Sequence, residues 1–213
     1  MTGTAKSGRE HRPNRRGRPT AENSRLKTAH LMEVARDLFA FQGYRAVTMR
    51  KVAEMAGVST RTLYDRFADK LSLFQASLDF GSMEFPRIAH DPAVRPEEAL
   101  RDYAAALVRM LSSDSSVRMY MVVAREGSEF PELVNSANAV QHKYLVVPLA
   151  AYMVAAGLAR DGEGEAIAKL FTALALADWQ RRFSFLRPLP AGDEVERHAE
   201  LATALFLKGA GNI

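Results

Sequence analysis

The sequence predicts an all-α fold. Beyond residue 24, apolar residues recur at three- and four-residue steps, as on the buried face of an amphipathic helix, and no stretch shows the sustained alternation of a strand. Glycine or proline stands at the ends of most of these series. With 213 residues, 47% hydrophobic and 25% charged, the chain can bury a core, so collagen-like, low-complexity and wholly disordered classes are excluded.

The first seventy residues predict an arm followed by four helices. Residues 1–22 lack apolar periodicity, so we expect a disordered basic arm. Side-chain oxygens suited to N-caps and glycines suited to helix ends mark the helix boundaries. We expect a first helix from about Ser24 to Gly43, a second over Met49 to Ala56 capped by Thr48, a third over Thr60 to Phe67 capped by Ser59, and a fourth capped by Asp69 with Leu71, Phe74 and Leu78 inward.

The rest of the chain is also predicted to be helical. Pro96, followed by two glutamates, is typical of a first helical turn. The apolar patterns and breakers predict helices from Pro96 to Leu111, from Ser113 or Asp114 to Arg125, from Pro131 to Gly157 with a kink at Pro148, from Gly162 to Arg187, and from Asp193 to Leu207.

Cysteine content and hydropathy exclude several protein classes. The absence of cysteine excludes disulfides, Cys-ligated metal sites and thiol nucleophiles. The sixteen uncharged residues from Tyr144 to Ala159 are too few for a membrane span and include Pro148 and Gly157, which favours a buried helix. The polar, basic N-terminal residues do not resemble a secretory signal, so we expect a cytoplasmic protein.

Charge divides the chain into two parts. Residues 1–70 have a net charge of +8, whereas the remaining 143 residues have a net charge of −4. The basic part suggests a polyanionic partner, through Coulomb attraction and counterion release. A solubilising tail is the alternative that charge alone leaves open.

The segment 48–67 has the residue pattern of a helix-turn-helix. Such a unit needs a small residue where its helices approach, a residue that tolerates positive φ in the turn, and an apolar anchor on the second helix. Ala53, Gly57 and Leu63 meet these needs. Arg50, Lys51 and Arg61 lie early in their helices, where the helix dipole disfavours cations, and phosphates nearby would remove that mismatch.

The residues Ser59-Thr60-Arg61-Thr62-Leu63-Tyr64-Asp65-Arg66-Phe67, preceded by Ala56-Gly57-Val58 and followed by Asp69-Lys70, resemble the signature of the TetR family of transcriptional regulators. The resemblance covers about residues 24–80. It implies that Thr48 touches a phosphate, that Ser59, Thr60, Arg61 and Thr62 reach base edges or phosphates, and that Tyr64 and Lys70 hold the DNA backbone. Arg61 stands where the family often has a small residue, so its pairing with a guanine is a separate hypothesis.

The arm contains a second DNA-binding pattern. Arg16-Gly17-Arg18-Pro19 looks like the core of an AT-hook, whose arginines lie in a narrow minor groove. A basic arm that gives only nonspecific attraction is an equal alternative. On either interpretation Arg16 and Arg18 are expected DNA contacts.

The resemblance implies three segments: the arm at 1–22, a helix-turn-helix domain at 23–70 and a helical ligand-binding and dimerisation domain at 71–213. The last two long helices are the expected homodimer surface, although intrachain packing explains the same residues nearly as well. The expected residues are the small Ala166, Ala168, Ala173, Ala175 and Ala177, and the apolar Leu201, Leu205 and Phe206. Methionine and aromatic residues concentrate between Tyr103 and Phe183 and suggest an adaptable pocket. The expected ligand contacts are Tyr103, Met110, Met121, His142, Trp179 and Phe183.

These features predict a sequence-specific DNA-binding regulator, a ligand-responsive repressor that acts as a homodimer on a palindromic operator. A small-molecule effector that contacts the fourth helix would change the separation of the two recognition helices, one from each subunit of the dimer. No cofactor, metal or membrane partner is expected. An enzyme is disfavoured because the sequence has no HExxH, P-loop, GxGxxG or GxSxG motif. An architectural DNA-binding protein without an effector remains the alternative.

Overall fold

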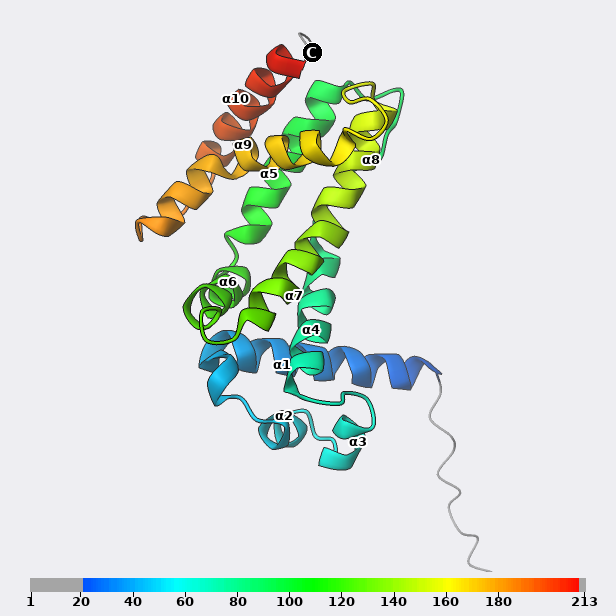
Figure 1. Ribbon diagram of the computed structural model, residues 1–213, viewed down its shortest axis with the longest axis vertical. Helices are drawn as coiled ribbons and strands as arrows, with labels where there is room; N and C mark the ends of the chain where they lie inside the picture. The colour runs from blue at the N-terminus through cyan, green and yellow to red at the C-terminus, as the bar shows by residue number, and fades with distance from the viewer. Residues whose placement is uncertain (1–20, 211–213) are drawn as a thin grey trace, which may run out of the picture.

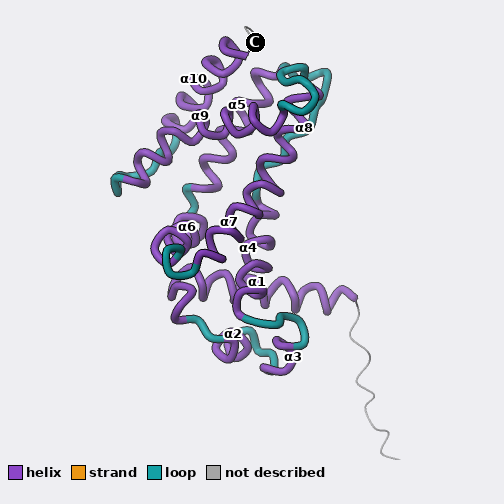
Figure 2. The backbone as a smooth tube through the Cα atoms, viewed as in Figure 1, coloured by secondary structure: helices purple, strands orange, loops and turns teal. Residues whose placement is uncertain are grey.

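The computed structural model describes residues 21–210 and, within them, forms helices and turns without strands, which confirms the all-α prediction (Figure 1 and Figure 2). Four helices come first, α1 (Ala21–Ala46), α2 (Met49–Met55), α3 (Thr60–Tyr64) and α4 (Lys70–Gly81), followed by a 3-10 turn, η1 (Ser82–Glu84). The later elements are α5 (Pro96–Leu111), α6 (Asp114–Glu126), α7 (Pro131–Gln141), the π-helical η2 (His142–Val146), α8 (Val147–Ala155), α9 (Gly164–Ser184) and α10 (Asp193–Ala210).

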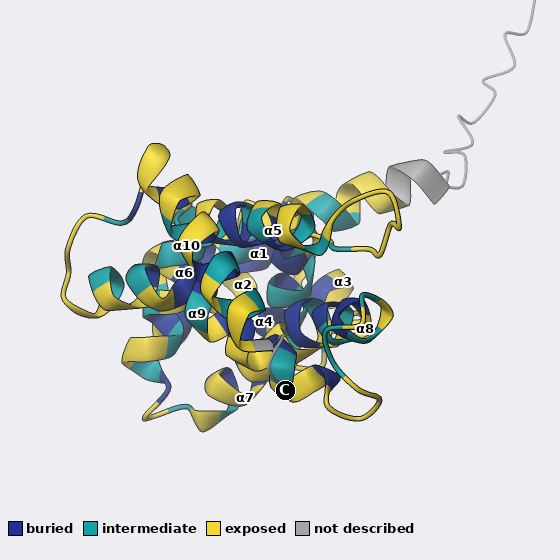
Figure 3. Ribbon diagram, turned by 90° about the horizontal axis from the view of Figure 1, so that it is seen from above, coloured by how far each residue is buried: buried dark blue, intermediate teal, exposed yellow. Residues whose placement is uncertain are grey.

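The helices α2 and α3 form one end of the molecule, below α1, whereas α9 and α10 lie toward the opposite end (Figure 1). The helix α4 packs against α1 at its start and against α7 further along, so it connects the two ends. Seen from above, exposed residues cover the outside of the helices and buried residues gather between them (Figure 3). This arrangement leaves α3 at the surface, remote from α10.

The helix starts follow the predicted caps. Thr48 Oγ1 accepts a hydrogen bond from the Lys51 amide at 3.2 Å, and Ser59 Oγ accepts one from the Thr62 amide at 3.0 Å. Asp69 and Ser72 form a reciprocal capping box at the start of α4. Each bond satisfies an amide that the helix itself cannot pair, which is why these local signals identify the starts correctly.

Several predicted helix limits differ from the structure. The helix α1 begins at Ala21, inside the segment assigned to the arm, because alanine and glutamate favour helix without apolar periodicity. The helix α3 ends at Tyr64, three residues before Phe67, although the Phe67 amide still bonds the Leu63 carbonyl at 2.9 Å. In α4, Leu73 and Phe74 are fully buried, whereas Leu71 and Leu78 are only partly buried at the margin of the core.

The long segment after Pro131 is interrupted where the proline pattern predicts. Five residues of π-helix, His142–Val146, precede Pro148, whose ring nitrogen cannot donate to the turn before it. Gly157 has φ 70° and ends the segment. The helix α9 begins at Gly164 because Gly162 has φ 88°, and it ends at Ser184, before Arg187; α10 runs three residues beyond Leu207.

Two buried clusters form the core. The first joins α1, α2, α3 and α4 and includes Met119 and Val122 from α6 and Leu133 from α7. The second joins α5, α8, α9 and α10 around Trp179 and Phe171. The first cluster therefore ties the helix-turn-helix to α6 and α7. No helix within residues 21–210 has the length and apolar character needed to cross a bilayer.

Candidate nucleic-acid interface and adjoining cavity

The turn between α2 and α3 has the geometry that the motif requires. Gly57 has φ 63°, and a Cβ there would meet no atom within 4 Å, so glycine is needed for the backbone conformation rather than for space. Ala53 and Leu63 are completely buried, and the Val58 amide bonds the Ala53 carbonyl at 3.0 Å. Leu63 anchors α3, which is too short to be stable alone.

The polar side of α3 faces solvent. Thr60, Arg61, Thr62 and Tyr64 are all exposed, and Ser59 at the cap is exposed too. Ser59 Oγ lies 2.7 Å from Thr62 Oγ1, so these two hydroxyls are already oriented by each other. Within residues 21–210, Arg61 and, on α2, Arg50 form no side-chain hydrogen bond, ion pair or ring contact. Two unpaired guanidinium groups beside a short exposed helix form a surface suited to phosphates and base edges.

Two lysines expected at the phosphates are engaged within the chain. Lys51 Nζ donates to Gln42 Oε1 at 2.7 Å. Lys70 Nζ donates to the Tyr44 carbonyl at 2.8 Å and lies 4.3 Å from the centre of the Tyr44 ring. Burial lowers the pKa of Lys70, and the charge of Glu126 partly offsets that effect. Arg16 and Arg18 lie outside the described residues.

A carboxylate from α6 holds the chain just before the helix-turn-helix. Glu126 Oε1 accepts from the Tyr44 amide at 3.1 Å, and its Oε2 accepts from the Arg45 amide at 2.7 Å. Lys70 holds the carbonyls of the same two residues. Gly43 has φ 82°, and a Cβ at this position would overlap Glu126 Oε1, so the close approach requires glycine.

The turn after Glu126 adds contacts of its own. Phe130 meets the Tyr44 ring edge-to-face with 5.2 Å between centroids, and Arg45 pairs with Glu129. We call residues 126–130 together with residues 43–45 the joint. The joint connects α6 to the end of α1 and thereby to the start of α2.

A cavity of about 660 Å³ lies between α4, α6, α7 and α9, directly behind the joint. Val123, Ala124, Gly127 and Ser128 belong to its wall, so the cavity wall continues into the joint. Leu78 and Ser82 line the side formed by α4 and η1. The volume lies within the usual range for pockets that hold small organic ligands.

The predicted ligand contacts are dispersed. Trp179 lines the cavity and is 2% exposed, and its Nε1 has no partner among residues 21–210. His142 is exposed and pairs with Glu165 at 3.1 Å, at the edge of a smaller hollow of about 310 Å³. The remaining predicted contacts do not line the large cavity: Tyr103, Met110, Met121 and Phe183.

Sequence reasoning missed the wall contributed by the N-terminal helices. The expected pocket lies within residues 103–183, whereas Arg36, Ser77 and Gly81 also line the cavity. Met119 and Tyr120 belong to the methionine and aromatic residues concentrated in that region but are not among the expected ligand contacts, and Val123 was missed; the three recur at helical spacing on α6. That spacing was the available signal, but it does not distinguish a cavity wall from a core face.

The surfaces of α9 and α10 carry an uncovered apolar stripe. Leu170, Leu201 and Leu205 are 63%, 58% and 52% exposed. Ala166, Ala173 and Ala177 are also exposed and lie at three- and four-residue steps from Leu170 along α9. We call these six residues the apolar stripe. Ala168 and Ala175, also expected at this surface, are instead buried in the core. Phe206 is only partly exposed, because its ring packs against Phe171 with 5.0 Å between the centroids.

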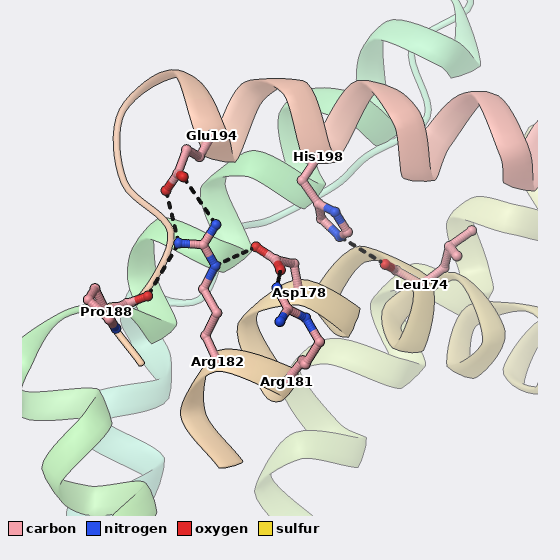
Figure 4. A network of polar contacts seen from close by, with 7 residues as sticks. All are labelled: Leu174, Asp178, Arg181, Arg182, Pro188, Glu194 and His198. Atoms are coloured by element: carbon pink, nitrogen blue, oxygen red, sulfur yellow. Dashed lines mark hydrogen bonds and ion pairs between the residues drawn. The ribbon is translucent and has the colours of Figure 1, made fainter. Parts of the chain in front are cut away.

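A polar network fixes the two helices that carry the stripe (Figure 4). Arg182 lies between Asp178, 2.8 Å away, and Glu194, which it binds through two nitrogens at 3.1 Å. His198 Nε2 lies 3.1 Å from the Leu174 carbonyl. Three polar side chains of this region are engaged in structural ion pairs: Asp178 with Arg182, His142 with Glu165, and Arg109 with Glu196.

The chain matches two family models. Residues 31–77 match the model described as bacterial regulatory proteins of the tetR family. Residues 98–209 match the model of the C-terminal domain of AefR-like transcriptional repressors. The two matches cover most of the described chain, and the first contains the whole helix-turn-helix.

Similar proteins include regulators from two bacteria. An uncharacterized HTH-type transcriptional regulator, YvkB of Bacillus subtilis (strain 168), is 26% identical over 84% of this chain and 94% of its own length. The HTH-type transcriptional repressor KstR2 of Mycolicibacterium smegmatis is 30% identical over 54% of this chain and 60% of its own length. Among solved structures, the flavonoid-responsive regulator FrrA has a TM-score of 0.70 at 24% identity and covers 86% of this chain and 96% of its own. That last similarity supports the fold.

Proposed function

The chain belongs to the TetR family of bacterial transcriptional regulators, and we propose that it acts as a ligand-responsive repressor, as a homodimer on a palindromic operator. Membership makes it a DNA-binding regulator and not an enzyme. The observation that supports the proposal most strongly is the exposed polar side of α3 with its unpaired Arg61. We infer that it works in the cytoplasm, where bacterial DNA lies, and that residues 23–70 are the reading domain and 71–213 the regulatory domain.

In this proposal α3 enters the major groove. Its N-terminal residues Ser59, Thr60, Arg61 and Thr62 meet base edges or phosphates, while Thr48, Arg50 and Tyr64 meet the backbone. Lys51 and Lys70 would have to leave Gln42 and Tyr44 to reach a phosphate. We therefore propose that Lys70 acts first by holding the joint, through the Tyr44 and Arg45 carbonyls, and only second by contacting DNA.

Replacing Arg61 by alanine is expected to weaken binding to the preferred DNA by about 5–150-fold, the cost of one bidentate contact to a guanine. The measurement is fluorescence anisotropy on the preferred duplex and on a series with each base pair changed. Specificity should relax at one position per half-site. If Arg61→Ala weakens binding to every duplex equally, Arg61 contacts a phosphate rather than a base. Arg87→Ala, an exposed arginine between η1 and α5, is the control and should bind normally.

Deleting residues 1–20 is expected to lower DNA affinity and flatten its dependence on salt, because the segment contains six arginines and lysines. The slope of log Kd against log salt concentration measures the effect. A full-length chain with Arg16→Lys and Arg18→Lys keeps the charge, so it should keep the slope but lose any preference for A·T-rich flanks. An unchanged slope after deletion would remove the arm from the interface.

Dimerisation is proposed through the apolar stripe. A single helix-turn-helix contacts few base pairs, and a two-fold dimer reads two half-sites about one turn (34–36 Å) or a multiple apart. An isologous contact between two copies would cover Leu170, Leu201 and Leu205 on both. Alanines at 166, 173 and 177 permit the close helix approach that such a contact needs.

The effector is proposed to bind the large cavity and to act through both α4 and the joint. A ligand that displaces the wall at Val123 and Gly127 also displaces Glu126, which holds the Tyr44 and Arg45 amides. That movement would change the position of α2 and α3. A coupling of about 1–3 kcal/mol corresponds to about a 5–150-fold change in DNA affinity.

A further inference from the structure

Among residues 21–210, the wall of the large cavity contains one side chain that is charged at neutral pH. This is Arg36 of α1, whose side chain is 13% exposed. The remaining lining side chains are apolar or uncharged polar groups, among them Asn138, Gln141 and Gln180. The electrostatic character of the cavity therefore depends on the state of Arg36.

Arg36 is already neutralised. Its two terminal nitrogens lie 3.3 Å from the two carboxylate oxygens of Glu84, a residue of η1 outside the cavity wall. The guanidinium packs against Gly81 of α4, where a Cβ would lie 3.0 Å from the guanidinium carbon. Glycine at 81 thus allows the guanidinium to lie flat against α4 within reach of Glu84.

The polar groups of the wall are partly satisfied as well. Ser77 Oγ donates to the Phe74 carbonyl and Ser82 Oγ to the Leu78 carbonyl, both at 2.7 Å. Trp179 Nε1 remains without a partner within residues 21–210. An uncharged acceptor on a ligand, such as a carbonyl oxygen, would accept a hydrogen bond from that N–H without bringing a charge into the cavity.

We propose that the effector is an uncharged, largely apolar molecule, and that the Glu84–Arg36 pair excludes anions of similar shape. A carboxylate or sulfonate would lose water on entry and find no free cation, and an ammonium would find no free carboxylate. The inference rests on the proposed role of the cavity as the effector site. Glu84 controls this selection against anions, because it determines whether the guanidinium at the wall is free.

Two dyes with one scaffold test the proposal. N-phenyl-1-naphthylamine is neutral, and 1-anilinonaphthalene-8-sulfonate adds a sulfonate. Trp179 is the only tryptophan of the chain, so its quenching reports binding at the cavity wall. The full chain should bind the neutral dye about tenfold or more tightly than the sulfonate, because the buried sulfonate lacks a counter-ion. Equal or tighter binding of the sulfonate, or binding of neither dye, would overturn the proposal.

Glu84→Gln supplies the decisive variant, because it frees Arg36 without changing the shape of the wall. It should raise affinity for the sulfonate several-fold and leave the neutral dye within about twofold. Glu97→Gln is the matched control, since Glu97 pairs with Arg95 outside the wall and should change neither affinity. An unchanged preference in Glu84→Gln would overturn the role of the pair.

A substitution that fills the cavity tests whether the dye that quenches Trp179 is bound there. Ala137→Phe, in the wall on α7, should abolish quenching by the neutral dye, whereas Ala139→Phe, exposed on the same helix and outside the wall, should not. Quenching that survives Ala137→Phe would contradict binding in this cavity. These measurements contain no DNA, so a failure here leaves the DNA-binding proposal standing, and a failure of DNA binding leaves the dye preference measurable.

Discussion

Replacing Leu205 by glutamate is expected to convert the proposed dimer into a monomer and to weaken operator binding by at least about a hundredfold, because one half-site alone gives few contacts. Leu205 is 52% exposed in the single chain and would be buried on both copies across a two-fold contact. The substitution would place two uncompensated carboxylates in an apolar interface. Leu170→Glu on α9 should have the same effect.

Analytical ultracentrifugation measures the loss of the dimer, and fluorescence anisotropy measures the loss of operator affinity. Met83→Glu is the control, since Met83 is 63% exposed but lies on η1, outside the apolar stripe. It should remain dimeric and bind DNA normally. A Leu205→Glu chain that is still dimeric would reject the stripe as the interface, and a monomer with full affinity would reject the two-site model of binding.

Replacing Glu126 by glutamine is expected to weaken the coupling between the cavity and DNA binding. The amide keeps a single acceptor, so either the Tyr44 or the Arg45 amide loses its partner, and the charge that attracts Lys70 is lost. Ala137→Phe serves as a permanent occupant of the cavity and should weaken DNA binding by about 5–150-fold in the native chain. In the Glu126→Gln background the same substitution should have a clearly smaller effect, because only the route through α4 remains.

A double-mutant cycle of DNA affinities makes this measurement. Glu129→Gln is the matched control, because it removes a neighbouring carboxylate that pairs with Arg45 by its side chain alone. An effect of Ala137→Phe that is as large without Glu126 as with it would show that the signal travels through α4 alone and would reject the role of the joint. No effect in either background would reject coupling from the cavity.

Local chemistry explains why the reading end of the molecule could be predicted from the sequence. Thr48, Ser59 and Asp69 cap their helices through bonds to amides three residues away, and Gly57 is required by its own φ. These interactions depend on neighbours in sequence. The sequence therefore identifies α2, α3 and the exposed polar side of α3.

Interactions between distant segments explain what could not be predicted. The bond from Glu126 to the Arg45 amide spans 81 residues, and the pair of Arg36 with Glu84 spans 48. Lys70 follows the family pattern of a phosphate contact, yet its ammonium packs on Tyr44 because the joint brings two carbonyls within reach. The cavity likewise forms only when four helices meet, so its wall follows from packing rather than from any local pattern.

Selection of bound duplexes from a random-sequence pool, with the purified full chain, tests the central claim most directly. If α3 is a reading helix duplicated by two-fold symmetry, the selected DNA will contain two inverted copies of one half-site, with centres about 34–36 Å or a multiple apart. Enrichment of no sequence, or of a single half-site without its inverted copy, would contradict the account.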